Sequence, residues 1–269
     1  MSTPAGSGMC RDPEQFIEHV RNRLWRRETP PSPGVPSGRP AKRDSVVLLP
    51  VTDTADAAAG FAPSLILNKR SERVRQAGDL CYPGGSVAPL DSALSLLLRF
   101  LPVSRWSHAN GRAAPGKTQA ATAVRLATGL REAWEEMRMN PLRLALLGIL
   151  PVERLVLFDR RIHPIVVWAS PRQHYSTNWE VARIVHIPIA ELLQPGNYAR
   201  YRPVISGMPV DRREVFPCFI HHGRQGREIL WGVSYRITMN FISRVFDFEP
   251  PESGGLPLIE GSLSATYMG

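Results

Sequence analysis

Hydrophobic and polar residues alternate along the chain with two different periods, so the sequence predicts helices and strands in the same protein. Near the start, Phe16, Val20 and Leu24 recur every four residues, which places them on one face of a helix. This helix is expected to begin at Asp12, because aspartate is a good N-cap and a proline follows it, and to run to about Arg27.

Short apolar runs, several of them β-branched, predict strands farther along. The expected strands cover 45–51, 64–68, 144–150, 162–169 and 182–187, with a hairpin formed by 214–220 and 228–233. Further helices are expected at 92–99, 118–139, 189–193 and 234–246. The stretch 118–139 is the clearest of them, because it is rich in alanine and free of proline.

The stretches between these elements divide the chain. Residues 30–40 hold five prolines and two glycines, which is typical of a linker. We therefore expect an N-terminal helical extension (1–29), a proline-rich linker (30–44), one main domain (45–248) and a tail (249–269). The tail has proline, glycine and serine without periodicity, so it is expected to be disordered, and the polar stretch 104–117 is expected to be a mobile loop.

The net charge of +9 suggests a nucleic-acid partner, but the ratio of arginine to lysine weakens that interpretation. Thirty of the 33 basic residues are arginines, a ratio that points to coding bias. Nucleic acid is therefore not the favoured partner, although RNA binding by the basic N-terminal half stays an alternative. Locally, however, four bases gather directly before a tight Pro-Gly-Gly turn; these are Lys69, Arg70, Arg73 and Arg75.

Membrane and disulfide signals are missing from the sequence. No apolar run reaches the length needed to span a bilayer, and the N-terminus has no apolar signal region, so we expect no transmembrane segment and no secretion. The three cysteines, Cys10, Cys81 and Cys218, are far apart and odd in number, which excludes a disulfide framework. A reducing compartment, and hence the cytoplasm, is the expected location.

Three carboxylates on the long helix are the first candidates for chemistry. Glu132, Glu135 and Glu136 share one helix face, and Arg131 stands four residues before Glu135 and can pair with it. Like charges so close together repel each other unless cations lie between them. Oxygen ligands favour hard divalent ions, so Mg²⁺ or Mn²⁺ is the expected cofactor. The alternative is a solvated charged face without a ligand.

Two separated segments together resemble the Nudix hydrolase family, and most closely its coenzyme A pyrophosphatase branch. They are the basic stretch with its Pro-Gly-Gly turn at 69–85 (KRSERVRQAGDLCYPGG) and the helix at 128–136 (TGLREAWEE). Later stretches also look like landmarks of the family, in the same order: 164–167 (PIVV), 178–181 (NWEV), 187–189 (IPI) and 230–237 (LWGVSYRI).

The resemblance implies a fold and a reaction. The fold is the Nudix α/β/α sandwich, a mixed β-sheet between helices with a catalytic loop–helix–loop. The reaction is metal-dependent cleavage of a diphosphate linkage in a small nucleotide, with coenzyme A or an acyl derivative as favoured substrate. Other substrates of the same kind (ADP-ribose, NADH or a dinucleoside polyphosphate) and a non-catalytic nucleotide-sensing domain are the alternatives.

The resemblance also implies roles for individual residues. Glu132, Glu135, Glu136 and the carbonyl of Gly85 would ligate the metal. Arg131 would orient a glutamate, and Glu180 would bind metal or activate water. The four bases Lys69, Arg70, Arg73 and Arg75 are candidates for phosphate contacts, with a solvent-facing position as the alternative.

The sequence departs from the family pattern at several points. Residues 92–121 look like an insertion, and Ala123 stands where the first glutamate of the family box is expected. Arg138 replaces a glycine after the box, which predicts a different helix end. The apolar stretch 93–103 fits a dimer or membrane-surface helix, a lid or a packed satellite helix equally well, so a homodimer is one of several alternatives.

Overall fold

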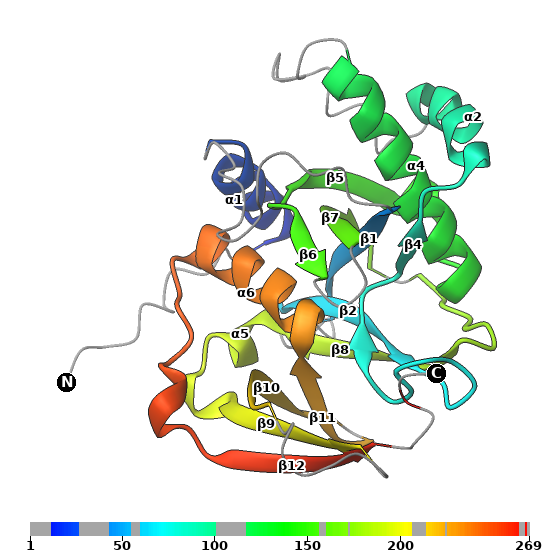
Figure 1. The fold of residues 1–269 in the computed structure, drawn as a ribbon. Coiled ribbons are helices and arrows are strands. Elements are labelled where there is room, and N and C mark those ends of the chain that lie inside the picture. Colours follow the sequence, from blue (N-terminus) through cyan, green and yellow to red (C-terminus); the bar gives the residue numbers. More distant parts are fainter. Residues whose placement is uncertain are drawn as a thin grey trace.

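The computed structural model describes residues 12–26, 43–54, 60–100, 117–155, 160–171, 173–205, 214–223, 225–263 and Tyr267. The expected linker at 30–40 and nearly all of the expected loop at 104–117 lie outside these residues. Within them, helices lie on both sides of a large mixed sheet, and a smaller sheet lies beside it (Figure 1).

The large sheet is built around β1, which pairs in parallel with β7 and antiparallel with β2 and β4. Its path is β3-β2-β1-β7-β5, with β8 paired to β2 and β6 paired to β7. The strands are β1 (Arg43–Asp53), β2 (Pro63–Arg70), β3 (Leu80–Cys81), β4 (Gly84–Ser86), β5 (Leu144–Ile149), β6 (Glu153–Leu155), β7 (Arg160–Ala169) and β8 (Val181–Pro188).

The two faces of this sheet bury different sets of side chains. On one face Val46, Leu48 and Ile66 form a core with Leu130 and Ala133 of α4 (Lys117–Met137). The other face packs against α1 (Pro13–Arg26) and α6 (Gly232–Phe246). The expected α/β/α arrangement with a mixed sheet is therefore confirmed. Two shorter helices are α2 (Pro89–Leu97) and α5 (Ile189–Leu192), and 3-10 turns lie at Leu98–Phe100, Pro141–Arg143, Pro195–Asn197 and Ser253–Gly255.

Helix α1 is part of the core, although a proline-rich linker sets it apart in the sequence. Its expected cap is present, since the backbone N–H of Gln15 donates to Asp12 at 2.9 Å. The ring of Phe16 lies 5.9 Å from that of Trp168 on β7. At Gly148 of β5 a Cβ atom would lie 2.6 Å from Leu24, so a glycine there lets the helix approach the sheet closely.

The expectation of a disordered tail is wrong for its described residues. Leu258–Leu263 form β12, which pairs in parallel with β9 (Tyr198–Ile205) and completes a second sheet in the order β11-β10-β9-β12. The other two strands, β10 (Phe216–Gly223) and β11 (Gly226–Trp231), form the expected hairpin. The side chains of β12 alternate between exposed and half-buried, so its order comes from backbone pairing and leaves little apolar pattern in the sequence.

The predicted change at the end of the long helix is also wrong. Arg138 has a φ of 55°, which is the left-handed conformation that a glycine would adopt there. Its N–H donates to the carbonyl of Trp134 at 3.0 Å, and its guanidinium lies 5.5 Å from the centre of the Trp134 ring. The backbone geometry is thus retained without the glycine.

Helix α2 begins at Pro89, just before the expected insertion at 92–121, and packs against α4. For the described part of 93–103 this fits a packed satellite helix, but Leu96, Leu97 and Phe100 are exposed, so the dimer, membrane-surface and lid alternatives are untested. In the part of the chain that the structure describes, no helix is both long and apolar enough to cross a membrane.

Candidate active site

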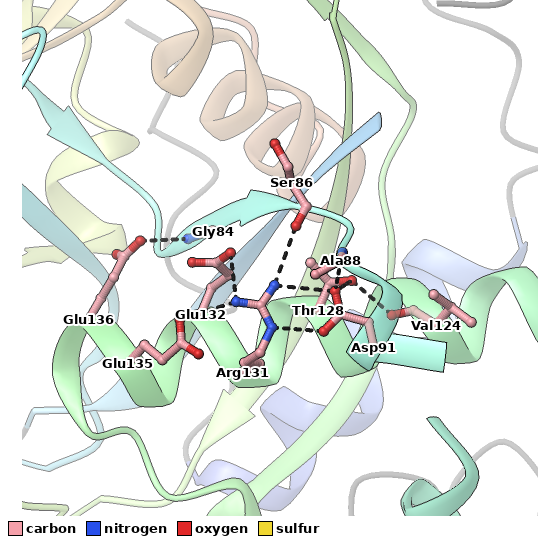
Figure 2. A network of polar contacts seen from close by, with 10 residues as sticks. All are labelled: Gly84, Ser86, Ala88, Asp91, Val124, Thr128, Arg131, Glu132, Glu135 and Glu136. Carbon is pink, nitrogen blue, oxygen red and sulfur yellow. Dashed lines mark hydrogen bonds and ion pairs between the residues drawn. The ribbon is translucent and has the colours of Figure 1, made fainter. Parts of the chain in front are cut away.

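Helix α4 carries the predicted carboxylates and lies unusually close to the sheet. The helix turns Gly129 toward β1, where an added Cβ atom would lie 3.2 Å from Leu48. Ala133, one turn later, is fully buried on the same side. Glu132 and Glu136 lie on the side of the helix that faces the Pro-Gly-Gly turn, whereas the half-exposed Glu135 points away from that turn (Figure 2).

Arg131 joins α4 to α2 through a buried carboxylate, as Figure 2 shows. Its Nε lies 2.8 Å from Asp91, whose side chain is fully buried, and its Nη1 lies 3.0 Å from Glu132 and 3.1 Å from Glu135. Burial by itself would raise the pKa of Asp91. Hydrogen bonds from Arg131, from the N–H of Ala88 and from Thr128 outweigh that effect, so the pKa is lowered. The predicted pairing of Arg131 with Glu135 is therefore present, together with an anchor on Asp91.

The two glycines of the Pro-Gly-Gly turn lie so close to neighbouring atoms that a side chain would clash at either position. At Gly85 a Cβ atom would lie 2.1 Å from Oε1 of Glu132, and at Gly84 it would lie 2.2 Å from the carbonyl oxygen of Val46. The N–H of Gly84 donates to Glu136 at 3.3 Å. The backbone of β4 thus lies directly against the carboxylates, as the sequence spacing suggests for a ligand-binding turn.

Negative charge is concentrated at this spot. Burial raises the pKa of Glu136 to about 7, and the charges of Glu132 and Glu180 add to the rise, against the hydrogen bonds from Gly84 and Asn68. Burial likewise raises the pKa of Glu132, although Arg131 opposes the shift. The carboxylates therefore lie in surroundings where a cation would be stabilised.

Curated proteins of known sequence match most of the chain. The chain is 28% identical over 196 residues to an uncharacterized Nudix hydrolase NudL of Citrobacter koseri, a match that covers 72% of this chain and 78% of that protein. It is also 28% identical to the NudL of Klebsiella pneumoniae, over 58% of this chain and 63% of that protein. The chain is therefore similar in sequence to Nudix hydrolases over most of its length.

Other comparisons add little to this assignment. No protein-family model matches the chain. A MutT/nudix family protein from Enterococcus faecalis resembles this structure with a TM-score of 0.41 and 10% identity, over 89% of this chain and 76% of that protein. The likeness to Nudix hydrolases therefore depends on the sequence match and its motif.

The residues that the sequence resemblance predicts as metal ligands fit a hard divalent cation in their chemistry. Glu132 and Glu136 supply carboxylate oxygens, and burial together with neighbouring carboxylates raises the pKa of both groups. The neighbouring Asn68 is fully buried, and its Oδ1 has no hydrogen-bond partner among the described residues. No three acidic, histidine or cysteine side chains of the described ranges lie close enough to make a complete metal site by themselves. Backbone or water oxygens would have to complete the coordination.

Glu180 lies close enough for its charge to raise the pKa of Glu136. It follows Asn178, whose N–H donates to the carbonyl of Glu136 at 3.0 Å, and its charge acts on Glu136. The segment before β8 is thus attached to the C-terminal end of α4. The side chain of Glu135 is half-exposed and, like that of Glu132, pairs with Arg131.

The structure separates the four predicted bases. The ammonium of Lys69 lies 2.8 Å from the buried Glu228 of β11, which also pairs with Arg183. Because neighbours on a strand point to opposite faces, Lys69 faces away from Asn68 and Glu136. Arg70 donates to the carbonyl of Arg75 at 2.8 Å, and Arg73 and Arg75 are exposed on the loop that follows β2.

Two polar residues of the site were not predicted. Asp91 anchors Arg131 from a different helix, and its only local signal is a proline at the first turn of α2 followed by an acid. Asn68 ends an apolar strand run, so a sequence pattern gives no reason to expect that its amide donates to Glu136. Both contacts are long-range, and sequence spacing reports only local ones.

Proposed function

We propose that this Nudix protein is a divalent-metal-dependent pyrophosphatase that hydrolyses the diphosphate linkage of a nucleoside diphosphate derivative. Coenzyme A or an acyl-coenzyme A is the favoured substrate, which water would cleave into 3′,5′-ADP and (acyl-)4′-phosphopantetheine. The observation that carries the proposal is the half-buried Glu136, held between Gly84, Glu132 and Glu180 with its pKa raised to about 7.

The carboxylate groups would hold Mg²⁺ or Mn²⁺ in this proposal. Glu132, Glu135, Glu136 and the carbonyl of Gly85 are the proposed ligands. A divalent ion supplies charge that offsets the phosphoryl oxygens and lowers the pKa of water. Arg131, anchored by its ion pair with Asp91, keeps Glu132 oriented toward the Pro-Gly-Gly turn.

The remaining groups would bind substrate and move a proton. Glu180 lies near enough to Glu136 to act on its pKa, and is proposed to accept the proton of the attacking water or to bind the metal. Arg70, Arg73 and Arg75 lie on or beside the loop after β2 and could bind phosphates. Lys69 fits that role less well, because Glu228 neutralises it on the other face of the sheet. The coenzyme A preference is supported by the likeness of 69–85 to that branch.

A substrate panel tests the proposal directly. Purified protein is incubated with coenzyme A, an acyl-coenzyme A, ADP-ribose, NADH and a dinucleoside polyphosphate, with Mg²⁺, Mn²⁺ or a chelator, and products are separated by chromatography. We expect metal-dependent turnover, with coenzyme A or its acyl derivative as the best substrate. The double variant Glu135→Gln plus Glu136→Gln should lose nearly all of it.

The matched control is Glu14→Gln, which changes an exposed glutamate of α1 on the opposite face of the sheet. It should turn over substrate like the unchanged protein. Turnover that survives the double variant would rule out the proposed site. Metal-dependent turnover of another substrate in the panel would keep the hydrolase and reject coenzyme A.

A further inference from the structure

A half-buried carboxylate outside the proposed metal site, Asp79, links three distant parts of the chain. Asp79 ends the loop between β2 and β3, and it accepts hydrogen bonds from Nε1 of Trp231 at 3.0 Å and from the hydroxyl of Tyr267. Burial raises the pKa of Asp79 to about 6, against these two hydrogen bonds. At neutral pH the group is therefore mostly ionised, and both bonds have a charged acceptor, which makes them stronger than neutral ones.

Tyr267 contacts the same loop through its backbone as well. Its side chain is 4% exposed, and its carbonyl accepts a hydrogen bond from the N–H of Gln76 at 3.0 Å. Gln76 has a φ of 56°, a conformation that residues other than glycine adopt at a cost. A residue near the C-terminus thus holds the loop at two points, and one of them is strained.

The other end of this loop lies against the proposed active site. Ser71 donates through its N–H to the carbonyl of Glu180 and through its hydroxyl to that of Trp179, both at 2.8 Å. Between Ser71 and Asp79 the loop presents the exposed Arg73 and Arg75. The loop is therefore attached to the site at one end and to Tyr267 at the other, with two arginines in between.

We propose that Tyr267 is a positioning residue that latches the loop 71–79, so that Arg73 and Arg75 are held ready for the phosphates of the substrate. The inference rests on the proposed function for the identity of the ligand, but the latch itself does not depend on turnover. A loop already ordered in the free protein loses less entropy when it binds a ligand, so the latch should act on substrate binding.

Limited trypsin digestion of the full chain tests the latch without substrate. The variants are Tyr267→Phe, which removes one hydroxyl, and Asp79→Asn, which removes the charge. Cleavage after Arg73 and Arg75 is followed by mass spectrometry and compared with cleavage after the exposed Arg227 in the hairpin of the second sheet. We expect cleavage in the loop to speed up about tenfold, the order expected when one hydrogen bond to a charged group is lost.

The control variant is Tyr175→Phe, which removes a hydroxyl for which the structure gives no hydrogen bond among the described residues, and it should digest like the unchanged protein. Loop cleavage that stays at the unchanged rate, or that rises equally after Arg227, would overturn the latch. In the substrate assay, Tyr267→Phe should raise KM several-fold with little change in kcat; a fall in kcat alone would also overturn it. If the unchanged protein has no turnover, the proposed function fails and the digestion still decides the latch.

Discussion

Asp91 is fully buried, and its charge is matched mainly by the guanidinium of Arg131, 15% exposed. Asp91→Asn leaves Arg131 paired only with Glu132 and Glu135, which are more exposed than Asp91. Removal of one partner from a buried ion pair costs about 3 kcal/mol. We therefore expect Asp91→Asn to lower the free energy of unfolding by about that amount and to reduce kcat/KM, because Glu132 loses its oriented partner. Urea denaturation and the substrate assay measure the two effects.

The matched control for Asp91→Asn is Asp247→Asn. Asp247 also pairs with an arginine, Arg23, but its side chain is 61% exposed, so the substitution should cost less than about 1 kcal/mol. Equal losses in the two variants would mean that the Asp91 pair does not behave as a buried one.

The left-handed conformation of Arg138 at the end of α4 should favour glycine over other small residues at this position. A residue with a side chain pays about 1 kcal/mol in the left-handed conformation that Arg138 adopts, and glycine does not. Arg138→Gly should therefore be more stable than Arg138→Ala by about 1 kcal/mol in urea denaturation. Both variants lose the contact with Trp134, so their difference isolates the backbone. Equal stability would contradict the left-handed helix end.

At the scale of single residues, the sequence predicted contacts made within one helix. The pairing of Arg131 with Glu135 follows from helical spacing, and the structure contains it. The anchor on Asp91 was not predicted, because 40 residues separate the two partners. The position of Lys69 shows the same limit, since its partner Glu228 is 159 residues away on another sheet.

At the scale of elements, the packing of α4 against β4 buries Glu136 and raises its pKa, so the stability of the protein should depend on pH. The pKa of Glu136 is raised from 4.5 to about 7, so the folded protein keeps that proton to higher pH than the unfolded chain does. Ionisation of Glu136 then costs stability as the pH rises from about 4.5 to about 7, and a bound cation should recover that cost.

We therefore expect Mn²⁺ or Mg²⁺ to stabilise the protein more at pH 8 than at pH 6, by about 1.4 kcal/mol for the one unit that separates pH 6 from this pKa. Thermal unfolding with and without metal at the two pH values measures the difference. Glu136→Gln cannot ionise, so it should show a much smaller dependence on pH. Stabilisation by metal that is equal at both pH values would show that Glu136 is not a ligand.

Elements were predicted well where they bury apolar side chains and poorly where they do not. Apolar patterns in the sequence mark the elements whose side chains are buried in the core, which are β1, β2, β5, β7, β8 and α1. β4 consists of two glycines and a serine, and β12 has no buried side chain. Such strands are held by backbone hydrogen bonds, which leave no hydrophobic pattern to read.

At the scale of the whole molecule, the sequence predicted the N-terminal helix as an extension (1–29) outside the main domain (45–248), and its contacts differ from that prediction. Phe16 is fully buried among the rings of Phe61, Trp168 and Phe246, which come from other parts of the chain. The indole of Trp25 donates to the carbonyl of Leu147 at 2.8 Å, which ties the end of α1 to β5. These contacts make α1 a layer of the fold.

If α1 is such a layer, then a substitution that disrupts its packing should lower the stability of the entire domain. Phe16→Ala should lower the free energy of unfolding by about 3–5 kcal/mol, the usual cost of removing a buried phenylalanine. The loss should appear in one cooperative transition, followed by far-UV circular dichroism and by tryptophan fluorescence. Glu18→Ala, on the exposed side of the same helix, should cost almost nothing. An unchanged main transition in Phe16→Ala, with a separate early loss of helix, would instead make α1 an independent appendage and leave the remaining elements as the complete folding unit.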